Sequence, residues 1–145
     1  MLVKVLEGRF RVAQPVERAF PLFSPRGEEL WAPDWKPEIL YTPASDWEEE
    51  LVFRTLRDGQ ETIWFVAKLD RESHRVRYHR VDVGLMAVTV SVACDAAGPE
   101  ETEVRVRYTF VATSEGGAAQ VESRTQEQFD GWMREWESAV AAILQ

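Results

Sequence analysis

Apolar and polar residues alternate along most of the chain between residues 38 and 112. Between 103 and 110, valine and aromatic residues occupy the even positions, and charged residues or threonine occupy the odd ones. The same alternation runs from 86 to 94. A period of two is typical of antiparallel strands with one buried face and one wet face. With turn signals such as Asp58-Gly59 between strands, the pattern predicts seven strands, over residues 7–12, 38–42, 49–56, 62–70, 75–81, 85–95 and 103–112.

Over the last part of the chain the hydrophobic period becomes that of a helix. Apolar residues recur at steps of three and four, which places them on one stripe of a helix that lies against an apolar surface. At about 1.5 Å per residue, a helix over 125–144 spans about 30 Å, enough to cross a whole sheet. The expected stripe consists of Val121, Thr125, Phe129, Trp132, Met133, Trp136, Val140, Ile143 and Leu144.

Prolines break up the first third of the chain. Six of the seven prolines lie between Pro15 and Pro43. Pro15 is well placed to open a short helix, because the first helical position does not need its N–H group. Ser24 followed by Pro25 predicts the start of a second short helix, which Pro33 ends.

These elements predict one α+β domain over residues 1–145. An antiparallel sheet of seven strands has one face to bury and only one long helix to cover it, so the sheet must curl around that helix. A curled sheet leaves a space that the helix alone does not fill. We therefore expect an internal cavity of roughly 300 Å³ or more, the usual size of a ligand site, bounded by Tyr78, Tyr108, Trp132 and Trp136.

Composition narrows the choice of partners. Asp and Glu together number 25 against 17 Lys and Arg, which gives a formal net charge of -8. Such a surface repels phosphate backbones and anionic lipid, so the sequence argues against nucleic acid or a membrane as partner. No apolar run approaches the ~20 residues of a membrane span, and the N-terminus lacks the pattern of a signal peptide. We expect a cytoplasmic protein.

Three segments carry a resemblance to a known superfamily: Phe10–Phe20 (FRVAQPVERAF), Gly27–Pro37 (GEELWAPDWKP) and Trp136-Glu137 near the end. With the order of the elements, they resemble the START-like, Bet v 1-like superfamily (SRPBCC), the polyketide cyclase/dehydrase and lipid-transport group. The resemblance covers nearly the whole chain. It implies the helix-grip fold, a seven-stranded curved antiparallel sheet wrapped around a long C-terminal helix, with two short helices after the first strand. The double-Trp segment is similar to a branch without assigned function, and none of these residues is catalytic in the family.

Motifs for metal, nucleotide or nucleophilic chemistry are missing from the sequence. It contains no His-Glu-x-x-His, Gly-x-Ser-x-Gly, P-loop or Gly-x-Gly-x-x-Gly motif. His74 and His79 have opposite side-chain parity on one strand, so they cannot both face one metal ion. Cys94 is the single cysteine and lies in phase with buried valines, which favours a small core residue over a reactive thiol. We expect neither a metal nor a cofactor.

The orientation of Arg80 is left open by the sequence. Arg80 shares the parity of Tyr78, which should face the interior. If Arg80 also points inward, its guanidinium needs an acidic ligand or a carboxylate such as that of Asp82 or Glu28. The alternative is that Arg80 lies in water at the end of its strand.

Aromatic residues form the largest group of candidate site residues. Any one of them could be ordinary core, but around a curled sheet the set is expected to line a cavity, with indole N–H and tyrosine O–H groups as its polar contacts. The candidate ligand-binding residues are Trp31, Trp35, Tyr41, Phe53, Trp64, Tyr78, Arg80, Met86, Val88, Tyr108, Phe110, Phe129, Trp132, Met133 and Trp136.

Three functions are compatible with this reading. The first is binding of a small hydrophobic or amphipathic molecule, as a carrier, sensor or store. The second is a cyclase- or dehydratase-type enzyme that uses Tyr78, Tyr108 and Arg80 to position a polyketide-like substrate. The third is a protein-interaction module similar to the chaperone-activator branch, which a filled core would favour.

The segment 62–69 predicts a further feature because it is apolar on both parities. If Trp64 faces the interior, Ile63, Phe65 and Leu69 face outward. Either a β-bulge rotates part of this row inward, or a partner covers it. In a homodimer, Phe65 would be the natural centre of the contact.

Overall fold

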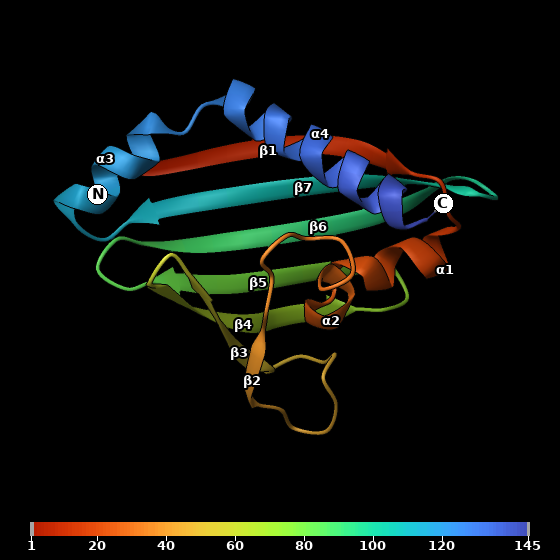
Figure 1. Ribbon diagram of the computed structural model, residues 1–145, viewed down its shortest axis with the longest axis horizontal. Helices are drawn as coiled ribbons and strands as arrows, with labels where there is room; N and C mark the ends of the chain where they lie inside the picture. Colours follow the sequence, from red (N-terminus) through yellow and green to blue (C-terminus); the bar gives the residue numbers. More distant parts are fainter. Residues whose placement is uncertain (1, 145) are drawn as a thin grey trace.

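Seven antiparallel strands form one sheet in the order β1-β7-β6-β5-β4-β3-β2 (Figure 1). The computed structural model describes residues 2–144. All seven predicted strands are present, and most are longer than the alternation indicated. They are β1 (Val3–Val12), β2 (Glu38–Tyr41), β3 (Val52–Arg57), β4 (Gln60–Asp70), β5 (Arg75–Asp82), β6 (Met86–Gly98) and β7 (Glu101–Ala112).

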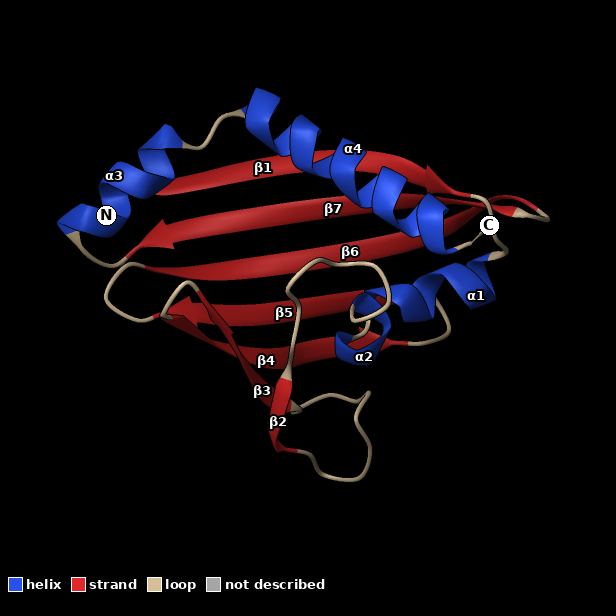
Figure 2. Ribbon diagram, in the orientation of Figure 1, coloured by secondary structure: helices blue, strands red, loops and turns tan. Residues whose placement is uncertain are grey.

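The helices lie on one side of this sheet (Figure 2). Three short helical segments follow β1, and two helices end the chain. They are α1 (Val16–Ala19), η1 (Phe20–Phe23), α2 (Pro25–Glu28), α3 (Glu115–Ser123) and α4 (Gln126–Ile143). The figure shows α4 running along β1 and β7 and α2 beside β4, whereas α1 lies at one end of β6 and β7. The predicted curved sheet with a long C-terminal helix is confirmed.

Side-chain capping sets where two of these helices begin, and the sequence predicted the first of these caps. The Ser24 hydroxyl accepts a hydrogen bond from the Gly27 N–H, 2.9 Å away, at the start of α2. At the start of α4, Thr125 and Gln128 form a capping box, which satisfies two of the free N–H groups of the first turn.

The predicted C-terminal stripe is wrong at three residues. Thr125 is the exposed N-cap of α4, and Ile143 is 39% exposed at the end of the helix. Val121 does not belong to the long helix, because Arg124 has extended backbone and separates α3 from α4. Val121 is nevertheless fully buried, on α3. The side chain of Lys4 donates hydrogen bonds to the carbonyl oxygens of Glu122 and Arg124, at 2.9 and 2.6 Å. This charge at the C-terminal end of α3 favours ending the helix there.

Close contact between α4 and the edge strand depends on Gly8. A Cβ atom added at Gly8 would lie 2.6 Å from Cγ of Met133 and 3.2 Å from the ring of Phe129. The absence of a side chain thus lets the apolar stripe of α4 rest directly on β1, and Phe129 and Met133 are buried there.

Residues 62–69 of β4, which are apolar on both faces of the strand, contain a β-bulge. A bulge was one of the two alternatives that the sequence predicted for this segment. Pairing between β4 and β5 changes register between Val66 and Lys68. Leu69 is therefore half-buried against the core, whereas Phe65 remains on the outer face with 41% of its surface exposed. Among the described residues, no helix is long and apolar enough to cross a membrane.

Candidate functional site

The concave face has an aromatic wall on the side away from α4. Strand register places Phe53, Trp64 and Tyr78 near one another on β3, β4 and β5. Phe53 pairs with Trp64, and Tyr78 pairs with Val66, two residues along β4 from Trp64. The rings of Phe53 and Trp64 stack with centroids 5.7 Å apart, and Tyr78 meets both edge-on. Trp35, from the loop before β2, closes over Trp64 at 5.4 Å.

A small cavity lies within this wall. Its volume is about 20 Å³, room for about one water molecule. The prediction of a cavity several hundred Å³ in size is therefore wrong for this conformation. Trp35, Trp136 and the wall residues pack against one another and fill the space that the curled sheet leaves. The cavity is lined by Glu28, Trp35, Phe53, Trp64, Tyr78, Val90, Val92, Tyr108 and Trp136.

Several polar atoms on the aromatic rings already have partners within the chain. The indole N–H of Trp31 donates to the Leu22 carbonyl at 2.7 Å, and that of Trp35 donates to the Pro25 carbonyl at 2.8 Å. The Tyr78 hydroxyl donates to the Phe23 carbonyl at 2.6 Å. These three bonds hold η1 and α2 against the wall. The three groups, which the sequence analysis proposed as polar contacts for a ligand, therefore stabilise the fold instead.

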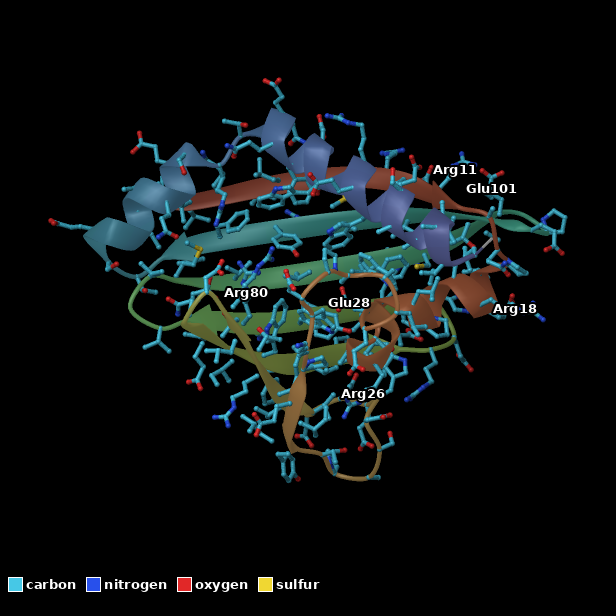
Figure 3. The ribbon with its side chains drawn as sticks, viewed as in Figure 1. Arg11, Arg18, Arg26, Glu28, Arg80 and Glu101 are labelled. Atoms are coloured by element: carbon cyan, nitrogen blue, oxygen red, sulfur yellow. The ribbon has the colours of Figure 1, made fainter. Side chains whose placement is uncertain are left out.

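Glu28 brings a carboxyl group to the cavity from the last turn of α2. Its side chain lines the cavity, and no described residue forms a hydrogen bond or ion pair with that carboxyl. Burial raises the pKa of Glu28 well above its usual value, because an apolar site disfavours the charged form. Figure 3 shows Glu28 and Arg80 on the same concave side of the sheet.

Arg80 points inward, which settles the question that the sequence left open. Its guanidinium carbon lies 5.4 Å from the Trp64 ring centre and 5.8 Å from that of Tyr108. One nitrogen pairs with Asp82, 3.5 Å away, and Asp82 also accepts a hydrogen bond from Thr62 at 3.0 Å. Of the two carboxylates named as alternatives, the observed partner is thus Asp82.

Tyr108 connects the cavity with Arg80. Its ring is buried and lines the cavity. Burial raises the pKa of Tyr108 to about 12, and the nearby Arg80 guanidinium offsets part of the rise. Within residues 2–144, the Tyr108 hydroxyl has no hydrogen-bond partner, unlike that of Tyr78. It is therefore a polar group that a ligand could use.

The fifteen candidate residues fall into four groups. Six line the cavity: Trp35, Phe53, Trp64, Tyr78, Tyr108 and Trp136. Six are buried in the surrounding core: Trp31, Met86, Val88, Phe110, Phe129 and Met133. Two are half-buried beside it: Arg80 and Trp132. Tyr41 is exposed over 56% of its surface and does not reach the interior, because the short strand β2 carries it at the edge of the sheet.

Sequence reasoning missed Glu28 as a cavity residue and named it only as a partner for Arg80. The only signal available was its place in the double-Trp segment 27–37, which also contains Glu29, Asp34 and Lys36. That signal does not say which way the side chain points, because α2 is a single turn set by its packing against η1.

The remaining reactive side chains are accounted for by packing or solvent. Cys94 is buried as predicted, and burial raises the pKa of its thiol to about 12. His79 is exposed on the outer face, while the His74 ring packs edge-on against Phe20 at 5.6 Å. The described residues contain no group of three or more His, Cys, Asp or Glu side chains that could hold a metal ion.

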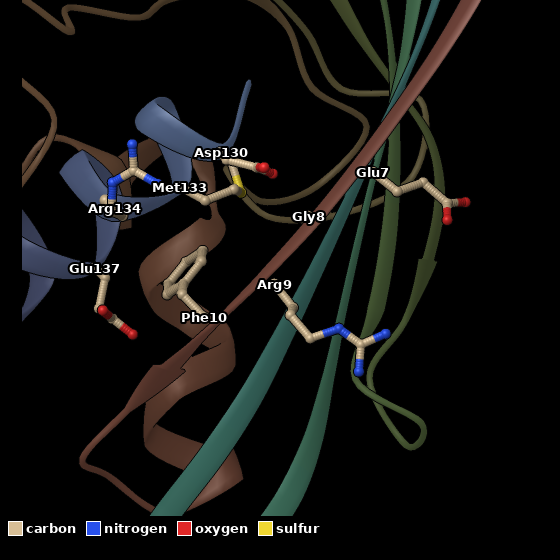
Figure 4. Close-up of a pocket in the computed structure, with 8 residues that line it drawn as sticks. All are labelled: Glu7, Gly8, Arg9, Phe10, Asp130, Met133, Arg134 and Glu137. Carbon is tan, nitrogen blue, oxygen red and sulfur yellow. The ribbon is translucent and has the colours of Figure 1, made fainter. Parts of the chain in front are cut away.

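A second hollow lies outside the sheet, between β1 and α4 (Figure 4). Its volume is about 360 Å³, and charged residues such as Asp130, Arg134 and Glu137 line much of it. Glu137 accepts a hydrogen bond from the Arg11 N–H at 3.0 Å, so part of the exposed edge of β1 is already satisfied there. This hollow is an open surface groove, and it lacks the aromatic walls of the interior.

Comparison with known proteins supports the fold. No protein-family model matches the chain, and no curated protein matches it in sequence. Ara h 8.0201 is 16% identical with a TM-score of 0.68, over 97% of this chain and 99% of its own. The Zhui aromatase/cyclase from Streptomyces sp. R1128 is 13% identical with a TM-score of 0.72, over 99% and 97%. Norcoclaurine synthase from Thalictrum flavum is 14% identical with a TM-score of 0.70, over 99% and 87%. The chain therefore has the Bet v 1-like helix-grip fold.

Proposed function

We propose that the concave interior binds a small hydrophobic or amphipathic molecule. The observation that carries the proposal is a stacked aromatic wall beside two polar groups, the Glu28 carboxyl and the Tyr108 hydroxyl, that have no partner among residues 2–144. Apolar walls with a few convergent polar groups are typical of small-molecule sites. A norcoclaurine synthase of this fold was solved in complex with dopamine and hydroxybenzaldehyde, two small aromatic molecules.

Ligand entry requires the interior to open, because a volume of about 20 Å³ holds no organic molecule. The covering segment, residues 29–37 between α2 and β2, is the part that moves. It contains no regular helix or strand, and it reaches the wall mainly through Trp35. Swinging Trp35 away from the wall costs one side-chain hydrogen bond and its ring contacts with Phe53 and Trp64, and it exposes those two rings.

Two measurements test this binding. Native mass spectrometry of the purified protein looks for a co-purified small molecule. Titration with fatty acids, sterols and aromatic polyketides follows tryptophan fluorescence and the melting temperature. At least one class should shift the emission and raise the melting temperature, since a ligand that binds only the folded state stabilises it.

A matched pair of variants locates the site. Val90 lines the cavity, whereas its neighbour Thr89 lies on the outer face of the same strand. Val90→Phe should abolish the response, and Thr89→Phe should leave it unchanged. Equal responses from both variants would place the ligand elsewhere, and no response in the wild type would favour the interaction module.

The second candidate function is catalysis of a cyclase or dehydratase type in the same cavity. It is favoured by Glu28, a carboxyl whose pKa is raised by burial, beside the Tyr108 hydroxyl. A protonated carboxyl in an apolar site is a usual general acid. Here Glu28→Gln should abolish turnover of a linear poly-β-ketone while retaining its binding. Unchanged turnover in that variant would exclude Glu28 as the acid.

The outer face of the sheet is the surface for the proposed homodimer. Register aligns Ile63, Val81, Ala87, Val111 and Val3 in one apolar row across five strands, and Phe65 stands in the next row. Sedimentation equilibrium at micromolar concentration should give a dimer mass for the wild type and a monomer mass for Phe65→Asp. A monomeric wild type would remove this proposal. The lack of a nucleic-acid partner stays a prediction from the charge, and the cytoplasmic location stays a prediction from the absence of a signal-peptide pattern and of a membrane-span-length apolar run.

A further inference from the structure

Two arginines approach the aromatic interior from opposite sides. Arg80 comes from β5 (Figure 3). Arg124 comes from the link between α3 and α4, and its guanidinium carbon lies 5.6 Å from the Phe110 ring centre and 5.4 Å from that of Trp132. Register places Arg80 and Phe110 on either side of Val88 in one row of the inner face.

The rings beneath the two guanidinium groups form one continuous surface. Arg80 lies over Tyr108, and the Tyr108 ring is 5.6 Å from that of Phe110 and 6.4 Å from that of Trp132. Because Tyr108 also lines the cavity, the arginine pair borders the proposed ligand site.

Hydrogen-bonding capacity at this pair is unused. The Nε atoms of both Arg80 and Arg124 are buried and have no hydrogen-bond partner. Within the described part of the chain, the Arg124 side chain has no ion-pair partner at all, although the protein as a whole is acidic. A buried donor without a partner costs free energy, more so when it is charged. The arrangement is therefore incomplete without an acceptor.

Charge also remains unbalanced here. Among the residues that the structure describes, Asp82 is the one carboxylate that pairs with either arginine, at 3.5 Å from Arg80. The Glu28 carboxyl does not replace it, because its environment favours the neutral form. Burial lowers the pKa of Arg124, and the nearby Arg80 lowers it further. An anion bound between the two guanidinium groups would raise this pKa again.

We propose that Arg80 and Arg124 together bind the carboxylate of an amphipathic organic acid, whose apolar body lies against the aromatic wall. This inference rests on the proposed function and names its ligand class. Guanidinium groups suit a carboxylate because they offer paired N–H donors in a planar fork. The adjoining rings suit an aromatic or alkyl body, and an uncharged molecule of the same shape would leave both Nε donors unsatisfied.

A matched pair of probes tests the charge requirement. Naphthalene-1-acetate and naphthalene-1-acetamide share the same ring system and nearly the same shape, but only the first is an anion. Isothermal titration of the wild type should give an affinity for the acetate at least about tenfold higher than for the amide, as expected for charge-assisted hydrogen bonds. Raising the ionic strength should weaken binding of the acetate and leave that of the amide unchanged.

Variants assign the preference to the two arginines. Arg124→Gln should remove the preference for the acetate without changing the affinity for the amide. The double variant Arg80→Gln with Asp82→Asn should also lose the preference for the acetate. Changing both residues avoids leaving the Asp82 carboxylate without its arginine partner. Arg134→Gln removes an exposed arginine of α4 and serves as the control, with the preference retained. Circular dichroism and melting curves check the folding of each variant.

The outcomes separate this inference from the proposed function. Equal affinity of the wild type for acetate and amide overturns the anion site while the binding function stands. A preference that survives both Arg124→Gln and the Arg80 double variant overturns the assignment. If neither probe nor any molecule of the titration panel binds, both proposals fail. The salt dependence of acetate binding to the wild type tests the charge requirement even where a variant does not fold.

Discussion

The two halves of the concave face are built differently. Under α4, Phe129 and Met133 are buried directly against β1 at Gly8. Under η1, α2 and the covering segment, the interior holds Glu28 and borders Arg80. A regular helix buries one apolar stripe and excludes polar atoms. An irregular cover held by a few hydrogen bonds tolerates them, and this difference puts the candidate site in the second half.

The largest effect on stability is expected from the loss of core packing under α4. Phe129 is fully buried against Tyr108 and Trp132. Phe129→Ala should lower the free energy of unfolding by about 3–5 kcal/mol, measured by urea denaturation. Trp35→Ala, in the half-buried covering segment, should cost less than half as much. Equal losses would mean that the two halves are equally tight.

The next test concerns the contact between α4 and β1. Gly8→Ala should lower the free energy of unfolding by about 1–3 kcal/mol, because the new Cβ meets Met133 at 2.6 Å. Gly131→Ala is the control, since the nearest atom to its added Cβ is the end of Arg134, 3.7 Å away. That change should stabilise the helix by about 1 kcal/mol. A neutral Gly8→Ala would show that α4 is not held closely against the edge strand.

The third test uses the pH dependence of stability. Burial raises the folded-state pKa of Glu28, so its contribution to stability is fully present below the unfolded pKa of about 4.3 and is lost as the pH rises through the folded pKa. Glu28→Gln should therefore be more stable than the wild type at pH 8, by about 1–3 kcal/mol. At low pH the two should be equal. The exposed Glu135→Gln is the control, and an identical pH profile for all three proteins would contradict the assignment.

The smallest effect distinguishes two tyrosines. Tyr78→Phe removes the hydrogen bond to the Phe23 carbonyl and should cost about 1 kcal/mol. Tyr108→Phe removes a hydroxyl without a partner in the described chain and should leave the free energy of unfolding nearly unchanged. Its effect should appear in ligand binding instead. A reversed order would mean that the hydroxyl of Tyr78, and not that of Tyr108, is free for a ligand.

Much of the fold was predictable because it depends on local sequence patterns. The alternation of β6 and β7, the stripe of α4 and the caps at Ser24 and Thr125 are properties of residues close in sequence. Helix α3 was missed because Gly116 and Gly117 are poor helix formers. Gly117 is required there by a distant segment, since a Cβ would lie 1.6 Å from the Leu85 carbonyl oxygen.

By itself the sequence determined the seven strands, the long terminal helix, the inward parity of the aromatic residues on β5 and β7 and the burial of Cys94. Only the tertiary structure decided that Arg80 turns inward, that Glu28 faces the cavity and that the interior closes to about 20 Å³. Periodicity and capping act between neighbours along the chain. The size of a cavity and the partners of a buried charge instead depend on how side chains from distant segments fill a shared space. Interiors pack so densely that moving one large ring, such as Trp35, decides whether that space is open or filled.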